Sequence, residues 1–292
     1  MSIKDSEIRV INIEDKEYPK LLRETKRAPK RIFVKGKIVP EENCLAIVGT
    51  RRCSDYGKEV AWKISGELSE RGLTIVSGLA PGIDTYTHLA VVEKRKRTIA
   101  VLGTGIDEKS IYPKSNIGLA KKIIETGGAL ISEYPPGTRG ARFTFPERNR
   151  IISGLSLGTL VVEAKKKSGA LITADWAKKQ KRKLFAIPGS IFSLNSKGPH
   201  RLIKEGAKLI ESYEDILEEL AITSQLNFSR KISAETNEEE LILEALKQGA
   251  LDLEKIIQKT KLAPEKLMSS LTLMELSGKV KNLAGNIYTI NS

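Results

Sequence analysis

The chain has 292 residues, of which 40% are hydrophobic and 29% are charged, and it carries a formal net charge of +13. Recurring apolar runs exclude a wholly disordered protein, no stretch reaches the ~20 apolar residues of a membrane span, and the first residues lack a secretory signal core. The two cysteines exclude a disulfide framework and a cysteine-rich metal site. We expect a cytoplasmic protein without cofactor or metal, in about two domains.

Residues 1–40 read as a short N-terminal preamble. A helix is expected to start near Tyr18, and residues 31–36 alternate like a short strand that ends at a glycine turn.

Residues 41–222 show a regular alternation of short apolar runs and helical stretches. Strands are expected at residues 45–48, 73–76, 98–102, 129–132, 159–163 and 184–187, and helices at 57–71, 83–93, 117–126, 170–180 and 213–220. A long basic connection is expected between residues 132 and 159. Continuous apolar strands alternating with helices predict an α/β fold, an extended Rossmann-like, doubly wound and mostly parallel sheet.

The C-terminal part differs in composition. Residues 223–237 are polar and lack periodicity, which is typical of a linker. Residues 238–292 contain three amphipathic helical patterns, at 238–247, 253–259 and 264–276, followed by two alternating runs around Ala284-Gly285-Asn286. Three helices and a hairpin predict a small winged-helix domain.

The positive charge is unevenly distributed. Residues 230–292 hold nine basic and nine acidic residues, so the whole excess lies in residues 1–229. Residues 136–183 alone hold twelve basic and three acidic residues. Such an excess attracts polyanions, although a lysine-rich solvated surface would look the same in composition.

Glycine-rich loops follow four of the expected strands. They begin at Gly49, Gly78, Gly103 and Gly189, and Arg51 follows the first strand directly. In a parallel sheet these loops meet at one edge, where glycine amides and helix N-termini can approach an anion, although glycine after a strand can also be simple turn geometry. The acidic residue of a dinucleotide site and the Walker sequence are both absent.

Aromatic and basic residues interleave around Phe145. Phe143 and Phe145 alternate with Arg142, Arg148 and Arg150, and aromatic faces among cations are how proteins hold unpaired bases and their phosphates. Phe145 could equally be a core residue. Residues 165–169 (Lys-Lys-Lys-Ser-Gly) open the next helix and form a second candidate phosphate cradle.

Catalytic constellations are scarce. The two histidines, His88 and His200, have no evident catalytic partner, and Asp84 could be a general base or a helix cap. We therefore expect no catalytic residues and no enzyme activity. The alternative is a Rossmann-like enzyme that hydrolyses nucleoside monophosphates with Asp84 or Glu163 as acid or base. A third hypothesis is that the protein is a transcription factor that acts through the winged helix.

Eight ordered motifs between residues 18 and 210 resemble the DNA-processing protein A family (DprA, also called Smf). They include Gly49-Thr50-Arg51, residues 77–84, residues 101–105, residues 112–116 and residues 145–156. The resemblance implies a cytoplasmic protein that binds and protects single-stranded DNA. It further implies that the protein helps to load RecA recombinase onto that DNA in natural transformation, and that it forms a homodimer through the Rossmann-like domain.

The resemblance also implies which positions bind DNA. These are Gly49, Thr50, Arg51, Gly78, Gly103, Lys114, Arg148, Asn149, Arg150, Lys167, Ser168 and Gly169. On this reading, Arg51→Ala or Arg148→Glu weakens binding and leaves the fold intact. The neutral C-terminal domain is open to a protein-contact role or a weak DNA role.

Overall fold

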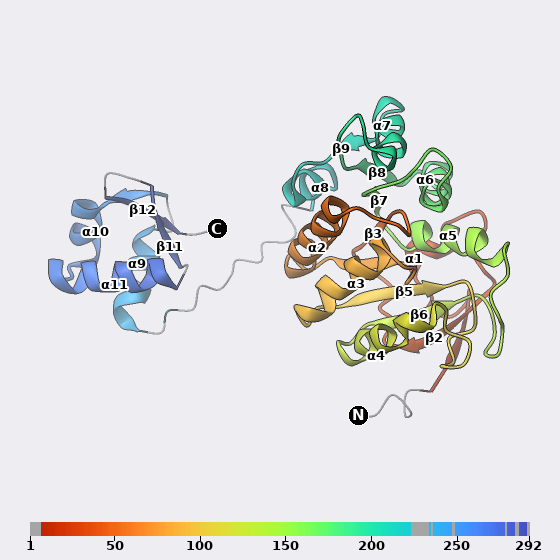
Figure 1. Cartoon of the computed structure of the whole chain (residues 1–292). Coiled ribbons are helices and arrows are strands. Elements are labelled where there is room, and N and C mark those ends of the chain that lie inside the picture. Colours follow the sequence, from red (N-terminus) through yellow and green to blue (C-terminus); the bar gives the residue numbers. More distant parts are fainter. Residues whose placement is uncertain are drawn as a thin grey trace. The chain divides into compact units, whose positions relative to one another are not determined.

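The chain forms two compact units, Met1–Leu226 and Asn227–Ser292. The computed structural model describes residues 7–222, 234, 236–246, 249–277, 279–283 and 286–290. Figure 1 shows the elements of each unit. Most of the linker expected at residues 223–237 lies outside the described residues.

The first unit is built on one nine-stranded sheet. Its strands are β1 (Arg9–Asn12), β2 (Arg31–Gly36), β3 (Cys44–Val48), β4 (Thr74–Ser77), β5 (Thr98–Leu102), β6 (Ala129–Ser132), β7 (Gly158–Val161), β8 (Lys183–Ala186) and β9 (Lys208–Leu209). Its helices are α1 (Lys20–Arg23), α2 (Asp55–Glu70), α3 (Ile83–Glu93), α4 (Ile117–Glu125), α5 (Thr144–Gly154), α6 (Gly169–Lys179), α7 (Lys197–Lys204) and α8 (Tyr213–Glu219).

The strand order is β1-β2-β6-β5-β4-β3-β7-β8-β9. All pairs from β6 to β9 are parallel, whereas β2 runs antiparallel to β6 and β1 antiparallel to β2. The sheet is therefore mostly parallel, as the alternating pattern predicts. The chain moves outward from β3 to β6 and then returns to place β7 on the other side of β3. This reversal is a topological switch point, where ligands bind in such folds.

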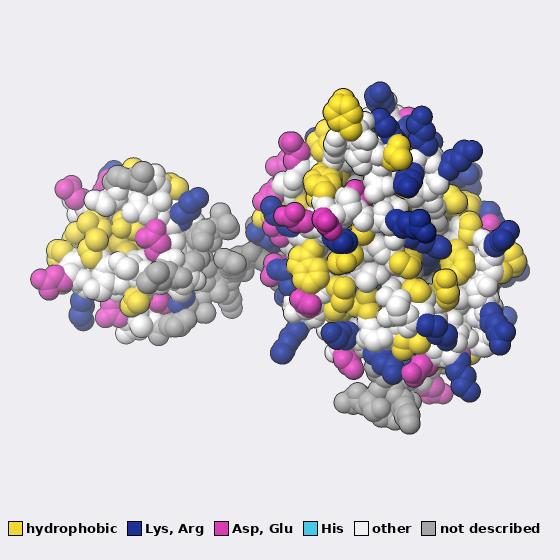
Figure 2. All heavy atoms as spheres, in the orientation of Figure 1, with side chains coloured by type: hydrophobic (Ala, Val, Ile, Leu, Met, Phe, Trp, Pro, Cys, Tyr) yellow, Lys and Arg dark blue, Asp and Glu magenta, His cyan; other side chains and the backbone are white. Residues whose placement is uncertain are grey.

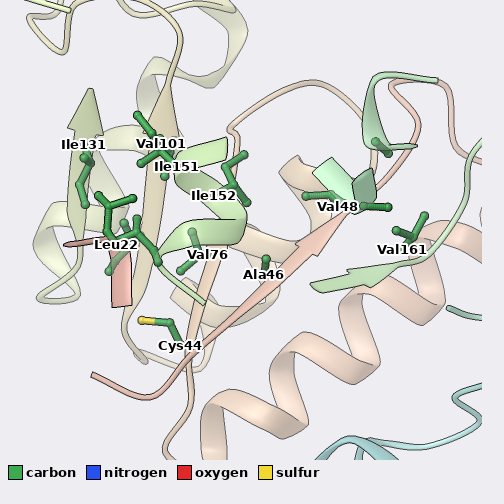
Figure 3. Packing of buried hydrophobic residues seen from close by; sticks show 14 of the residues in the cluster. Leu22, Cys44, Ala46, Val48, Val76, Val101, Ile131, Ile151, Ile152 and Val161 are labelled. Carbon is green, nitrogen blue, oxygen red and sulfur yellow. The ribbon is translucent and has the colours of Figure 1, made fainter. Parts of the chain in front are cut away.

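Helices cover both faces of the sheet, and β3 shows why its sequence is a continuous apolar run. Cys44, Ala46 and Val48 pack in the cluster that includes residues of α1, α5 and α6, whereas Leu45 and Ile47 pack against α2 and α3 on the opposite face. Side chains alternate across a strand, so a strand covered on both faces must be apolar at every position. Figure 3 shows part of the first cluster around Cys44, Ala46 and Val48.

Two expectations about local structure are wrong. The preamble at residues 1–40 is not separate, because β2 pairs with β6 and β1 extends the sheet beyond it. The basic connection before β7 contains an eleven-residue helix, α5, whose residues Ile151 and Ile152 are buried. Helix α5 was missed because Pro146 and several charges interrupt its apolar pattern, yet proline is tolerated in a first helical turn.

The second unit has the three helices and the hairpin that the sequence predicts. It comprises α9 (Asn237–Leu246), β10 (Leu251–Asp252), α10 (Leu253–Thr260), α11 (Pro264–Leu276), β11 (Val280–Asn282) and β12 (Ile287–Ile290). The strands form a small sheet in the order β10-β12-β11, around a core that includes Ile242, Leu267 and Tyr288. Ala284 and Gly285 of the expected turn lie outside the described residues.

Candidate nucleic-acid interface

A cavity of about 810 Å³ opens at the switch point between β3 and β7. Four segments supply its walls: residues 48–52 after β3, Ala80 and Asp84 around the start of α3, residues 140–152 in and before α5, and residues 165–173 after β7. Tyr112 completes the rim. The cavity thus lies beyond the carboxyl ends of the parallel strands, where the glycine loops were expected to meet.

The lining of this cavity is strongly basic. The basic lining residues are Arg51, Arg52, Arg142, Arg148, Lys165 and Lys167, and among the described residues the one acidic lining residue is the buried Asp84. Lysine and arginine side chains are also prominent on the face of this unit that Figure 2 shows. A concave surface with such an excess concentrates the field and attracts polyanions.

Aromatic rings stand beside the cations at the rim. The Arg51 guanidinium carbon lies 5.6 Å from the ring centroid of Phe145, and the ring centroids of Phe145 and Tyr112 are 5.8 Å apart at 51°. Tyr112 is exposed and Phe145 is partly exposed. A cation over one ring and a second, tilted ring beside it offer both a phosphate ligand and faces for unpaired bases.

The backbone around Thr50 holds Arg51 and Arg52 at the cavity. The Thr50 amide donates to the Glu163 carbonyl at 2.7 Å, and the Thr50 carbonyl accepts from the Ile83 amide at 3.2 Å. Thr50 Oγ1 accepts from the Arg52 amide at 3.3 Å. Because the amide and the carbonyl of Thr50 are both hydrogen-bonded, the backbone that carries the exposed side chains of Arg51 and Arg52 is held in place.

The N-terminus of α6 forms another part of the cavity wall. Ser168 is its N-cap and accepts from the Ala170 amide at 3.4 Å, and Lys165 and Lys167 are exposed just before it. A helix N-terminus carries free amides and the positive end of the helix dipole. This part of the wall therefore combines two ammonium groups with the positive end of the α6 helix dipole.

Arg148 lies under the cavity and is only 5% exposed. Its Nη1 donates to the Gly78 carbonyl at 2.6 Å and also to the Val101 carbonyl, and its Nε donates to Asn149 Oδ1 at 3.1 Å. Burial lowers the Arg148 pKa to about 10, opposed by the attraction of Asp84. Arg148 therefore remains charged at neutral pH and ties α5 to the ends of β4 and β5.

Asp84 is the buried counter-charge in this floor. Its Oδ2 accepts from the Gly78 amide at 3.2 Å. Burial raises the Asp84 pKa, whereas Arg148 and hydrogen bonds from backbone and Ser77 act in the opposite direction. Glu163, the other candidate acid, accepts from the Ser54 amide at 2.9 Å, from Ser54 Oγ at 2.5 Å and from Asn195 Nδ2 at 3.2 Å. Both carboxylates thus hold the scaffold together.

The structure brings eight of the twelve expected positions to the cavity: Gly49, Thr50, Arg51, Arg148, Asn149, Lys167, Ser168 and Gly169. Gly78, Gly103, Lys114 and Arg150 are not among its lining residues.

The four remaining positions have other surroundings. A Cβ on Gly78 would lie 2.5 Å from Arg148 Nη1, and one on Gly103 would lie 3.0 Å from Phe145 Cδ1, so both glycines allow α5 to approach the sheet. Lys114 is exposed beside Lys109. Arg150 is buried and donates to both carboxylate oxygens of Glu133 at 2.6 Å.

Eight of the twelve basic residues at positions 136–183 therefore fall into two groups. Arg142, Arg148, Lys165 and Lys167 line the cavity. Arg150, Lys178, Arg182 and Lys183 are paired with Glu133, Glu205, Glu24 and Glu219, respectively. Composition alone overstates the charge available to a ligand.

Four lining residues, Arg52, Arg142, Lys165 and Tyr112, were not among the twelve expected positions, although the sequence analysis singled out Arg142 beside Phe145 and Lys165 in the second candidate phosphate cradle. Arg52 and Lys165 each lie within two residues of an expected position, so local adjacency could have identified them. Tyr112 is likewise two residues from Lys114, another expected position, but only the folded chain places it beside Phe145. In the described residues no cluster of His, Cys, Asp and Glu could hold a metal, and no helix there has the length and apolar character needed to cross a membrane.

Comparisons with known proteins agree on one family. The family model for DNA recombination-mediator protein A matches residues 9–221, and that for the DprA winged helix domain matches residues 228–286. The chain is 45% identical to the DNA processing protein DprA of Bacillus subtilis, over 73% of this chain and 71% of that protein. It is 46% identical to the Protein Smf of Escherichia coli, over 70% of this chain and 54% of that protein.

Two solved structures have the same fold. The X-ray structure of DNA processing protein A from Streptococcus pneumoniae superposes with a TM-score of 0.68 at 44% identity, covering 73% of this chain and 74% of that one. A DNA processing protein A from Helicobacter pylori, described for its unique single-stranded DNA binding mode, superposes with a TM-score of 0.66 at 27% identity. That match covers 75% of this chain and 98% of the other.

Proposed function

Given that this chain belongs to the DNA recombination-mediator protein A (DprA/Smf) family, we propose that it binds and protects single-stranded DNA in the switch-point cavity. The observation that carries the proposal is the lining itself, in which five exposed cations accompany the buried Arg148 and Asp84, and Phe145 and Tyr112 stand at the rim. Cations track phosphates, and aromatic faces stack on bases only when those bases are unpaired.

The strand is held by residues with separate roles. Arg51, Arg52, Arg142, Lys165 and Lys167, all of which line the cavity, bind phosphates. The first amides of α6 at Gly169 add hydrogen bonds to the same phosphates. Arg148 does not bind DNA but holds the floor on which these groups stand.

We further propose that the protein helps to load RecA recombinase onto the bound strand during natural transformation and recombination. We also propose that it acts in the cytoplasm as a homodimer formed through the Rossmann-like unit. Membership of the family supports these finer roles. Sedimentation tests the dimer, and the rate of RecA nucleation on single-stranded DNA, with and without this protein, tests the loading.

We propose that this chain is a binding protein and not an enzyme. One observation favours the enzyme alternative, since Asp84 lines the cavity with a raised pKa. General acid–base hydrolysis of a nucleoside monophosphate would require a carboxylate free to exchange a proton with the substrate. Asp84 instead accepts from the Gly78 amide, and the charge of Arg148 favours its ionised form. Incubation with nucleoside monophosphates, followed by detection of released base, tests the alternative.

The deciding experiment is fluorescence anisotropy with a labelled single-stranded oligonucleotide, competed by unlabelled single strand or by duplex of equal length. We expect the single strand to displace the label and the duplex to fail, because paired bases cannot reach Phe145 and Tyr112. Equal competition by duplex would show that the cavity binds polyanions in general and does not select single strands. Absence of binding would refute the proposal.

A further inference from the structure

The loop after β8 displays three apolar side chains to solvent. Phe192 exposes 90% of its surface, Ile191 64% and Leu194 66%. Among the large hydrophobic residues that the structure describes, Phe192 is the most exposed. Exposed apolar groups in a cluster mark an interaction site more often than single ones do.

The loop is anchored at both ends, so its exposure is built into the fold. Tyr56 Oη donates to the Pro188 carbonyl at 2.8 Å, and His200 Nε2 lies 3.0 Å from the Gly189 carbonyl. Lys197 Nζ donates to the Ile191 carbonyl at 2.7 Å. The backbone is thus fixed by side chains from α2 and α7 immediately beside Phe192.

The loop also adjoins the cavity. Asn195 Nδ2 donates to the Arg52 carbonyl at 3.2 Å, and the Asn195 carbonyl accepts from the Ala164 amide at 2.7 Å. Arg52 and Lys165, the residue after Ala164, both line the cavity. Phe192 is three residues from Asn195, a separation of at most ~11 Å of extended chain.

The charge of the surrounding segment favours a nucleic acid as the occupant. Residues 176–204 contain no acidic residue, and Lys197 and Lys204 are basic there, whereas Arg201 is paired with Glu205 at 3.4 Å. An aromatic side chain in a segment that carries only positive charge is the pattern by which proteins hold single strands.

We propose that Phe192 is a base-stacking platform that extends the single-strand track beyond the cavity. A strand that leaves the cavity between Arg52 and Lys165 places an unpaired base on the Phe192 ring, with Lys197 near the adjoining phosphate. This inference rests on the proposed function of the cavity, and it assigns to a second site the part of the strand that the cavity does not hold.

The test compares oligo(dT) of about 4 nucleotides, chosen to fill the cavity alone, with oligo(dT) of about 16 nucleotides, the upper end of the range of site sizes for single-strand-binding folds. The quantity measured is the ratio of the two affinities for the wild type, Phe192→Ala, Phe192→Leu and Phe192→Trp. Val10→Ala, an exposed apolar residue on β1 at the far edge of the sheet, is the matched control.

We expect Phe192→Ala and Phe192→Leu to reduce the long-to-short affinity ratio about 5- to 150-fold, the range that base–aromatic stacking contributes. Phe192→Trp should preserve the ratio, and its added fluorescence should be quenched by the long oligonucleotide only. Leucine retains apolar surface without a π face, so a normal ratio in Phe192→Leu would overturn stacking.

Two further outcomes separate the proposals. If the wild type fails to bind either oligonucleotide, the proposed function itself is wrong. If Phe192→Ala leaves the ratio unchanged but alters the sedimentation coefficient, the loop is covered by a second copy of the chain and the stacking proposal is overturned. An unchanged ratio with unchanged sedimentation also overturns it. Because Phe192 is almost fully exposed, melting temperatures of all variants should equal that of the wild type.

Discussion

The guanidinium of Arg148 occupies the space that a side chain on Gly78 would need. A Cβ atom built on Gly78 lies 2.5 Å from Arg148 Nη1, and the same nitrogen donates to the Gly78 carbonyl at 2.6 Å. Two positions that the family resemblance assigns to DNA binding are therefore partners in the floor of the cavity. This relationship changes what their substitution should do.

We predict that Arg148→Ala destabilises the protein rather than only weakening DNA binding. It would leave Asp84 buried without its counter-charge and the Gly78 and Val101 carbonyls without their donor. Each hydrogen bond from a charged group contributes about 1.5–3 kcal/mol. Urea denaturation measures this cost. Arg142→Ala, at an exposed cavity position, is the control and should weaken binding with an unchanged midpoint. An unchanged midpoint in Arg148→Ala would contradict the prediction.

Gly78→Ala should destabilise the wild type by forcing Arg148 from its position. In the Arg148→Ala background, the same substitution should cost less, since the atom it would meet is gone. We expect a coupling free energy of about 0.5–3 kcal/mol in a double-mutant cycle of unfolding free energies. If the changes in unfolding free energy of the two substitutions were strictly additive, Gly78 would be required for a reason other than the position of Arg148.

Arg51→Ala should weaken single-strand binding about 10- to 100-fold, as expected for loss of hydrogen bonds to a charged phosphate. Arg51→Lys keeps the charge and should recover part of the loss, without the planar contact on Phe145. Arg31→Ala is a matched control, because Arg31 also lies over a ring, that of Phe33, on β2 away from the cavity. Anisotropy gives the affinities. Equal effects of the Arg51 and Arg31 substitutions would remove Arg51 from the site.

Binding should depend on salt in proportion to the exposed cations of the cavity. These are Arg51, Arg52, Arg142, Lys165 and Lys167. With one phosphate per cation, and about 0.7 counterions released per phosphate of a single strand, the slope of log K against log salt should be about −3.5. Arg51→Ala should make it shallower by about 0.7. A slope near zero would show that attraction between these cations and the phosphates does not determine the affinity.

His88 should make the first unit less stable as pH falls. Its Nδ1 lies 2.8 Å from Thr98 Oγ1, which itself donates to the Ile75 carbonyl, so Nδ1 carries the proton and the buried Nε2 is left without a partner in the described structure. Burial, with a smaller effect of Arg148, lowers the His88 pKa to about 3. The unfolded chain, with a pKa near 6.5, then binds more protons between these values.

The free energy of unfolding should therefore fall as the pH drops below about 6.5. It should be about 2 kcal/mol lower at pH 5 than at pH 8. Urea denaturation at several pH values measures it. His88→Gln keeps a donor for Thr98 but does not titrate in this range, so its stability should change less between pH 8 and pH 5. Parallel profiles of the two proteins would contradict the assignment.

The sequence by itself determined the architecture and the edge of the sheet on which the cavity opens. Continuous apolar strands such as residues 45–48, four of them followed by glycine loops, predict a parallel sheet with a ligand site beyond the strand ends, and the structure has a parallel sheet with a cavity there. These features are local, because strand periodicity and turn residues are readable within a few positions.

Only the tertiary structure decided which charges face a ligand. Arg148 and Arg150 belong to the same basic segment as Arg142, yet folding buries the first under the cavity and pairs the second with Glu133. The same holds for Tyr112, which meets Phe145 across 33 positions of sequence. Burial and pairing depend on contacts between distant segments, and neither composition nor spacing along the chain specifies them.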